Sequence, residues 1–419
     1  MNPGAQADSL RSFDPELASL IQREHERQSS TIDLIASENH VSHSVRAALG
    51  SLLTDKYAEG YPGRRYYSGC GVVDDIETLT VDRAKAVFGS EHANVQPHSG
   101  SQANFAVYQA LIPPGSTILG MDLSHGGHLT HGAEVSFSGK FFRSMTYGVD
   151  RKTHRIDYDH VRALALHHRP SLIIAGASSY PRIIDFSIFG DIAREAGAPL
   201  MVDVAHIAGL IAGGVHPSPV PVADVVTGTT QKTLRGPRGG FILSKASHSS
   251  KIDSAVFPGS QGGPLMHVIA AKAVCFREAL LPSFSEYARS IVENSRIIAQ
   301  QFMDEGLRVI SGGTDNHLVL VDLASLNITG KEAELALERA GIVANRNKIP
   351  YDTRSAMVAG GLRVGTAAIT TRNFGVDEVV TIAQLICQVL RDPSSESLRA
   401  RVQSRVREMC ERHPIPGAD

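Results

Sequence analysis

Cysteine is scarce in this sequence, and neither sign of charge dominates. Four cysteines are spread over 419 residues without a CxxC pair, which argues against a disulfide framework and a cysteine-based zinc site and fits a reducing compartment. Lysine and arginine total 41 against 43 aspartates and glutamates, a net charge of −2. The chain therefore has no overall basic field that would hold nucleic acid or an anionic membrane.

Long apolar runs are also missing. The sequence has no run of about 18 apolar residues, which a membrane-spanning helix needs, and its opening residues lack the basic and apolar segments of a secretory signal. No internal repeat or low-complexity linker is present. At roughly 150 residues per domain, the length predicts two or three packed units. We expect a soluble, cytoplasmic protein of enzyme size with no nucleic-acid or membrane partner.

Short apolar runs alternate with helical segments through the middle of the chain. Helices are predicted at residues 101–112 and 188–196, and strands at residues 117–121, 171–177, 200–204, 225–230 and 240–243. Such alternation is typical of an α/β protein with a mainly parallel sheet.

The pattern changes after about residue 281. A long helical segment at residues 285–306 leads to a strand at 317–323 and a helix at 331–340, which is typical of a smaller α+β unit. At the other end, Leu17, Leu20 and Ile21 recur at helical spacing. We therefore predict an N-terminal arm (residues 1–55), a large domain (56–285) and a small C-terminal domain (286–419).

Asp203 and Lys232 carry the strongest chemical signal. Asp203 ends a predicted strand in MVDVAH, and Lys232 follows in the polar turn TTQKT. Pyridoxal phosphate requires such a pair, because a lysine binds its aldehyde covalently and a carboxylate pairs with its pyridinium nitrogen. Alone, each residue is more often a loop-capping aspartate or an exposed lysine. The surrounding segments favour the cofactor.

Ser99, Gly100 and Ser101 lie at the start of the helix predicted at residues 101–112. Small residues at a helix start expose backbone N–H groups to an anion, and the helix dipole adds to the attraction. An ordinary serine N-cap is the alternative interpretation. Beside Asp203 and Lys232, we interpret this segment as the phosphate site of the cofactor.

Three histidines, His125, His128 and His131, lie close together in SHGGHLTH. No carboxylate cluster accompanies them, so we favour an imidazole stacked on a flat ring and predict no metal. The segment YAEGYPGRRYY, residues 57–67, combines four tyrosines with Glu59 and two arginines. It is either a surface loop with stacked aromatics or a segment that handles substrate and protons.

Together these segments resemble the serine hydroxymethyltransferase family. LIASEN, KYAEGYPGRRYY, NVQPHSGSQAN, HGGHLTHG, KTLRGPRGG, SAVFPGSQGGP, SGGTDNHLVLVDL and GLRVGT follow in the family's order, from about residue 33 to beyond residue 372. The resemblance implies a fold-type I pyridoxal-phosphate architecture, with a mainly parallel seven-stranded sheet in the large domain and a smaller C-terminal α+β domain. It also implies a homodimer or homotetramer with active sites at the subunit interface.

The resemblance implies roles for individual positions. Lys232 would be the Schiff-base lysine, with Glu59 and Tyr67 as further catalytic residues. The cofactor would be held by Tyr57, Ser99, Gly100, Ser101, His128, Ser178, Asp203, His206, Gln231 and Gly263. The amino acid and the folate would contact Ser37, Leu123, Gly127, Leu129, Asn347, Ser355, Met357 and Arg363. Among these, Arg363 would bind the amino-acid carboxylate as a planar bidentate donor.

The activity that the resemblance implies is a transferase reaction of one-carbon metabolism. Pyridoxal phosphate would serve the exchange of a hydroxymethyl group between serine and glycine, with tetrahydrofolate as co-substrate. An inactive scaffold is disfavoured because Lys232, Asp203 and Arg363 are all present.

The segment before the lysine departs from the family, which has four threonines followed by His-Lys. Here Gly228 replaces one threonine and Gln231 replaces the histidine, and a glutamine cannot titrate near neutral pH. A methyl group on Cα needs space near the lysine, and one methylene is worth only about 1–3 kcal/mol of discrimination. A hydroxymethyltransferase or aldolase that acts on 2-methylserine with D-alanine is therefore the alternative, with Gly228 and Gln231 as its specificity residues.

Overall fold

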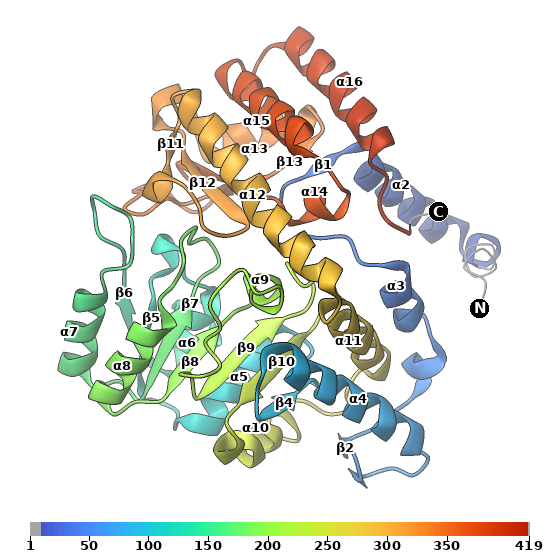
Figure 1. Cartoon of the computed structure of the whole chain (residues 1–419), viewed down its shortest axis with the longest axis vertical. Helices are drawn as coiled ribbons and strands as arrows, with labels where there is room; N and C mark the ends of the chain where they lie inside the picture. Colours follow the sequence, from blue (N-terminus) through green and yellow to red (C-terminus); the bar gives the residue numbers. More distant parts are fainter. Residues whose placement is uncertain (1–9, 418–419) are drawn as a thin grey trace.

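A seven-stranded sheet forms the centre of the larger part of the molecule in the computed structural model, which describes residues 10–417 (Figure 1). Its strands are β4 (His92–Asn94), β5 (Thr117–Met121), β6 (Arg143–Tyr147), β7 (Leu172–Gly176), β8 (Leu200–Asp203), β9 (Val225–Thr229) and β10 (Gly240–Ser244). The order is β4-β10-β9-β8-β7-β5-β6, and neighbours from β9 to β6 are parallel, whereas β10 runs antiparallel to both β9 and β4. The expected mainly parallel seven-stranded sheet is confirmed.

Helices cover both faces of this sheet, so its strands are apolar on both sides. One face packs against α5 (Gly100–Leu111), α6 (Phe137–Phe141) and α10 (Ser249–Val256) through strand residues such as Met201 and Ile174. The alternate residues, such as Val202 and Ile173, face a second set of helices. That set consists of α4 (Gly71–Phe88), α7 (Tyr158–His168), α8 (Phe186–Ala196), α9 (Ala208–Ala212) and α11 (Met266–Ala279).

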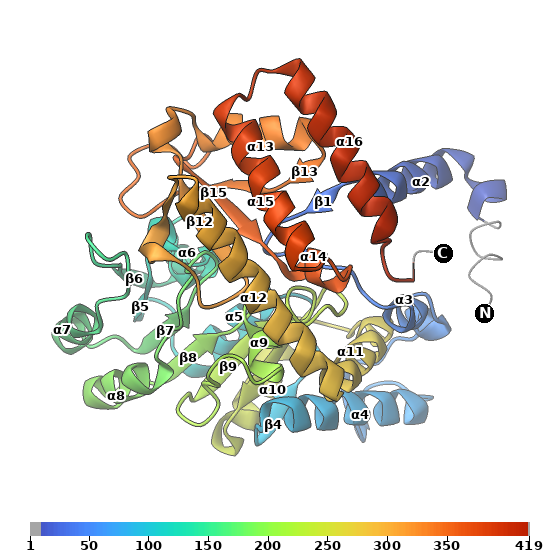
Figure 2. The same ribbon diagram turned by 45° about the horizontal axis from the view of Figure 1, so that its top comes forward.

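A smaller antiparallel sheet lies above the first in Figure 1. Its order is β11 (Arg308–Val309), β12 (Leu318–Asp322), β15 (Gly361–Gly365) and β14 (Asn345–Asn347). It packs with α13 (Gly330–Arg339), α14 (Ala367–Thr371), α15 (Val376–Arg391) and α16 (Glu396–Arg412) around a core of its own. The long helix α12 (Pro282–Asp304) runs along both parts, as Figure 2 shows.

The N-terminal region reaches into this smaller core. The short strand β1 (Ile32–Asp33) pairs in parallel with β13 (Ile342–Val343), and Ile32 and Leu34 are fully buried there. The preceding helix α2 (Pro15–Ser30) has no buried residue, and α3 (His43–Leu49) follows. The division into an arm and two domains stays a prediction, and residues 1–9 of the predicted arm lie outside the described residues.

Between residues 10 and 417, none of the helices has both the length and the apolar character that crossing a membrane requires.

Candidate active site

Two strands of the large sheet, and one helix that packs on it, bring the predicted cofactor residues together. Asp203 is the last residue of β8, Lys232 lies in the turn after β9, and α5 begins at Gly100. Because β8 and β9 are parallel, their carboxyl ends share one edge of the sheet, where ligands of open α/β sheets bind. We call Lys232, Asp203, His128 and Arg363 the Lys232 group.

Asp203 is buried, and its carboxylate accepts hydrogen bonds from neighbouring side chains. Its Oδ2 accepts from Asn104 Nδ2 at 2.9 Å and from His131 Nε2 at 3.0 Å. His131 Nδ1 accepts from the backbone N–H of His128, so the proton of His131 is on Nε2. Burial alone would raise the pKa of Asp203, but His131, His128 and Asn104 outweigh it and hold this pKa well below its ordinary value. The carboxylate is therefore ionised and can form an ion pair with a cationic group placed beside it.

His128 lies next to this carboxylate. Its Nδ1 accepts from the backbone N–H of Thr130 at 3.2 Å, and burial lowers its pKa to about 4, so the imidazole is neutral. Ligand atoms of His128, His131 and Asp203 all lie within 4.8 Å of one another, close enough for a metal ion. Both ring nitrogens of His131 are already hydrogen-bonded, however, so a metal would have to displace its bond to Asp203.

Lys232 is 9% exposed. Burial lowers the pKa of its amine to about 8, with Asp203 opposing this effect and Arg363 and Arg238 adding to it. Its backbone carbonyl accepts from Asn39 Nδ2 at 2.9 Å, which ties the turn to the N-terminal segment. A lysine with such a pKa has a substantial neutral fraction near neutral pH, and the neutral amine is the form that attacks an aldehyde.

The start of α5 offers an anion site beside these residues. Ser99 Oγ caps the helix by accepting from Gln102 N at 3.2 Å, while the N–H groups of Gly100 and Ser101 belong to the first turn, which has no helical acceptors. A Cβ on Gly100 would lie 2.7 Å from Thr229 Cγ2. Only glycine therefore lets the helix approach β9 this closely.

A cavity of about 540 Å³ is lined by two members of the Lys232 group, His128 and Arg363. Its walls include seven predicted site residues: Leu123, Gly127, His128, Leu129, Ser178, Asn347 and Arg363. Arg363 of β15 donates through Nε to Asn345 Oδ1 at 3.0 Å and through Nη1 to Ser178 O at 2.9 Å. The pKa of Arg363 is lowered by burial to about 10, so it remains a cation at the cavity wall. Such an arginine can bind a carboxylate.

Ser37 lies in the segment that packs beside Arg363. A Cβ on Gly365 would lie 2.4 Å from Ala36 Cα, and Gly365 N donates to Leu34 O at 2.7 Å. The residues on either side of Ser37 thus touch the strand that carries Arg363 and the turn that carries Lys232.

His206 pairs with a histidine from the smaller sheet. Its Nδ1 lies 3.2 Å from His317 Nε2, and both rings are fully buried. Burial lowers both pKa values, that of His317 to about 3. Two neutral rings at this distance form one hydrogen bond, in which one of the two nitrogens donates its proton to the other.

A second set of predicted residues lies apart, and we call Tyr57, Glu59, Tyr67 and Gly263 the Glu59 group. Tyr67 Oη donates to Glu59 Oε2 at 3.2 Å, the Tyr57 and Tyr67 rings meet edge-on, and a Cβ on Gly263 would lie 2.8 Å from the Tyr57 ring. Tyr57 is 57% and Tyr67 47% exposed. Within residues 10–417, no hydrogen bond, ion pair or ring contact joins this group to the Lys232 group.

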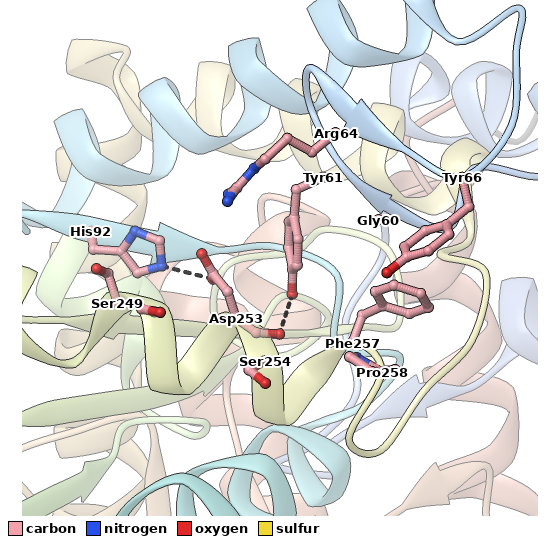
Figure 3. A pocket seen from close by; sticks show the side chains of 11 residues that line it. Gly60, Tyr61, Arg64, Tyr66, His92, Ser249, Asp253, Ser254, Phe257 and Pro258 are labelled. Carbon is pink, nitrogen blue, oxygen red and sulfur yellow. Dashed lines mark hydrogen bonds and ion pairs between the residues drawn. The ribbon is translucent and has the colours of Figure 1, made fainter.

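The hairpin of β2 (Gly60–Tyr61) and β3 (Arg64–Arg65) follows Glu59 directly and packs against the rest of the same chain. Figure 3 shows Tyr61 and His92 hydrogen-bonded to Asp253 of α10, and all three residues line a cavity of about 440 Å³. Tyr61 Oη donates to Asp253 O at 2.7 Å, and His92 Nε2 lies 2.9 Å from Asp253 Oδ1. These contacts hold the loop through Tyr61, whereas Tyr57 and Tyr67 remain exposed.

Gly228, one of the two predicted specificity residues, does not open space in the site. A Cβ on Gly228 would lie 2.3 Å from the Phe241 ring, on the face of β9 that packs against α4 and α11. This corrects the expectation that Gly228 leaves room for an α-substituent, because Phe241 fills that space. Gln231 Oε1 accepts from Gly239 N at 3.4 Å. Ser355 and Met357 flank Ala356, which lines the 540 Å³ cavity.

Four contact residues had no role in the sequence analysis: Asn104, His131, His317 and Asn345. Three of them stand in quoted segments, Asn104 in NVQPHSGSQAN, His131 in HGGHLTHG and His317 in SGGTDNHLVLVDL. The motifs contain them, but nothing in the sequence says which side chain they orient.

A family model described as serine hydroxymethyltransferase matches residues 10–386. The match covers both sheets and every residue of the two groups.

Proposed function

The chain belongs to the serine hydroxymethyltransferase family, whose members are pyridoxal-phosphate-dependent transferases, and we propose that it exchanges a hydroxymethyl group between serine and glycine with tetrahydrofolate as co-substrate. One observation carries the proposal: a buried lysine with a pKa of about 8, next to an ionised aspartate. An amine that is partly neutral near neutral pH, beside a permanent anion, suits covalent capture of a cationic aldehyde ring.

The residues present fit pyridoxal phosphate. Lys232 would hold the aldehyde carbon, Asp203 the ring nitrogen and the start of α5 the phosphate, and the neutral His128 ring would lie against the cofactor ring. His206 and Ser178 would lie near the phenolic oxygen. When bound, the cofactor supplies an electron-accepting ring that stabilises negative charge on Cα of an amino acid.

The chain's own residues would position the amino acid and move its protons. Asp203, held ionised by His131 and Asn104, would keep a proton on the ring nitrogen. Arg363 and Ser37 would bind the carboxylate, which fixes the orientation of the bonds at Cα. The remaining cavity wall, with Leu123, Leu129 and Asn347, would receive the folate, and Ser355 and Met357 would contact it from the rim.

A second copy of the chain would complete the site. Tyr57 and Tyr67 of the Glu59 group are exposed, the group lies apart from the Lys232 group, and Leu17, Leu20 and Ile21 of α2 also expose apolar side chains. We therefore propose a homodimer, alone or within a tetramer, in which one protomer presents Glu59 and Tyr67 to the Lys232 of its partner. Glu59 would then hold the proton of the substrate hydroxyl. Tyr57 and Gly263 would contact the cofactor phosphate from the same side.

The alternative substrate, 2-methylserine with D-alanine, now depends on Gln231 alone, because Phe241 fills the space beside Gly228. Initial rates with serine and with 2-methylserine, each with and without tetrahydrofolate, distinguish the two. We expect serine turnover that depends on tetrahydrofolate. Faster turnover of 2-methylserine, or turnover independent of folate, would contradict the proposal. The four cysteines are free and buried, and a cytoplasmic location remains a prediction.

A further inference from the structure

Lys272 of α11 is a buried lysine that the proposed chemistry does not use. It is 1% exposed, and its Nζ donates to three backbone carbonyls: Val95 O at 2.7 Å, Pro97 O at 3.0 Å and Gly240 O at 2.7 Å. All three donor positions of the ammonium are thus occupied. The side chain links α11 to the segment that leads into α5 and to the start of β10.

No carboxylate neutralises this cation at contact distance among residues 10–417. The acid with the largest influence on it is Glu77, whose Oε2 already lies 2.6 Å from Arg65 Nη2. Burial lowers the pKa of Lys272 to about 7. A buried charge without a counter-charge is unfavourable, so an anion bound nearby would stabilise the protonated lysine.

The nearest part of the candidate site is the phosphate turn, residues 97–101. Pro97 accepts from Lys272, and a Cβ on Gly240, which also accepts from Lys272, would lie 2.3 Å from Ser99 O. A neighbouring glutamine supports the same segment, since Gln261 Oε1 accepts from His98 N at 3.0 Å. The ammonium therefore lies directly behind the residues whose N–H groups begin α5.

We propose that Lys272 is a positioning residue for the phosphate of the bound cofactor. By binding the carbonyls of Val95, Pro97 and Gly240, it fixes the peptide planes that lead into α5, so that the N–H groups of Gly100 and Ser101 face the site. Its positive charge lies behind these N–H groups, where a phosphate dianion compensates it. This inference depends on the proposed use of pyridoxal phosphate. It predicts that Lys272 affects the binding of the phosphate group and not the binding of the ring.

The test compares two ligands that differ only in the phosphate. Pyridoxal 5′-phosphate and pyridoxal are titrated into the full-length apoprotein, and binding is followed by absorbance and by quenching of tyrosine fluorescence. We expect Lys272→Met to weaken pyridoxal 5′-phosphate by roughly 10- to 100-fold, the size of one partly buried charge interaction, and to leave pyridoxal unchanged. Inorganic phosphate should also compete less well against pyridoxal 5′-phosphate in this variant.

Two further variants make the result decisive. Lys272→Gln keeps hydrogen-bond donors but removes the positive charge, so it separates the contribution of the hydrogen bonds from that of the charge. If Lys272→Met does not fold, Lys272→Gln is used alone. Lys245→Met is the matched control, because Lys245 follows the opposite end of β10 and pairs with Asp224 at 2.8 Å. It should bind both ligands as the wild type does.

Each outcome has a distinct meaning. Equal weakening of both ligands by the Lys272 variants would make the residue merely structural, and unchanged binding of both would remove it from the phosphate site. Either result overturns the inference. If the wild-type protein binds neither ligand, the proposed function fails instead.

Discussion

The Lys232 group and the Glu59 group would serve one site, but they are built in opposite ways. Lys232 and Asp203 are buried. Burial lowers the pKa of Lys232, whereas hydrogen bonds and neighbouring charges hold the pKa of Asp203 below its ordinary value against the effect of burial. Tyr57 and Tyr67 are about half exposed, and Tyr67 contacts Glu59 through one hydrogen bond of 3.2 Å. The first group is complete in one chain, whereas the second remains open to solvent.

This difference follows from what each group has to do. A lysine needs burial and neighbouring charges to become a neutral nucleophile, and the fold of one chain supplies both. A carboxylate that exchanges a proton with a substrate needs water excluded at the moment of reaction. The surface around Glu59 achieves this only when another surface covers it. Assembly is therefore part of the proposed catalytic apparatus.

The most direct test of this difference mixes two variants of the chain, one altered in the Lys232 group and the other in the Glu59 group. Lys232→Ala should remove covalent cofactor attachment, and Glu59→Gln should lower kcat by about 10²- to 10⁴-fold. If each site combines the two groups from different protomers, mixed dimers contain one intact site. Equal amounts of the two variants should then recover about a quarter of wild-type activity, the statistical share of intact sites in C₂ dimers.

Native mass spectrometry of the mixture verifies that hybrids form. Mixing two separate preparations of Lys232→Ala is the control and should recover nothing. Hybrids that form without any recovered activity would mean that both groups act within one chain.

Half of the Lys232 group, Asp203 and Lys232, could be predicted from sequence because these two residues stand at or just after the ends of strands. The segments around Asp203 and Lys232 are short apolar runs followed by polar turns, and the strands observed there end at Asp203 and Thr229, within one residue of the predicted ends. The phosphate turn was predictable for the same reason, as small residues precede an apolar helix.

Contacts between distant segments could not be predicted in this way. Asn104 and His131 reach Asp203 only because α5 and the turn after β5 pack on the same sheet edge. The orientation of Gly228 depends on its position within β9 and on its neighbour Phe241 across the strand pair. Local sequence gives neither. The helices α4 and α11 were not predicted, although buried residues such as Val73, Thr80 and Ala84 recur at helical spacing.

Arg363→Gln tests the electrostatic half of the comparison. Without the guanidinium, the serine carboxylate loses a buried partner, and the KM for serine should rise on the order of 10²-fold, the effect of truncating one member of a buried charge pair. Arg363 also lowers the pKa of Lys232, so its removal should raise that pKa above about 8.

The pH dependence of cofactor attachment provides the second measurement. The protonated amine cannot attack, so the attachment rate should increase as pH rises through the pKa of Lys232 and then level off. The midpoint should move to higher pH in Arg363→Gln. Arg346→Gln is the control, because Arg346 lines the same cavity but pairs with Glu334. An unchanged midpoint in Arg363→Gln would mean that the charge of Arg363 does not influence the pKa of Lys232.

Gly228→Thr should affect stability rather than substrate choice. The new side chain would meet the Phe241 ring behind the Lys232 group, and overpacking of this kind costs about 1–3 kcal/mol of unfolding free energy. Urea unfolding measures the loss, and Phe241→Leu in the same chain should recover part of it. Tyr67→Phe, in the exposed group, should leave the unfolding free energy unchanged. A shift in the ratio of kcat/KM for serine and 2-methylserine would contradict the assigned orientation of Gly228.

Gln231→His should have the smallest effect. The contact of Gln231 Oε1 with Gly239 N is 3.4 Å long, beyond the usual range for such hydrogen bonds, so its loss should change stability little. Because the amide is directed at this loop, the ratio of kcat/KM should shift towards serine by less than about 10-fold, the lower end of what one methyl group provides. Rates with both substrates measure the shift, and Gln231→Glu, which has the same shape as glutamine, separates the effect of charge from that of size.

A larger shift at unchanged stability would mean that Gln231 contacts the substrate in the assembled site, and 2-methylserine would then become the better candidate. With no shift, the replacement of histidine at this position has no bearing on substrate choice, and the two substrates are distinguished by the Lys232 group and its cavity alone.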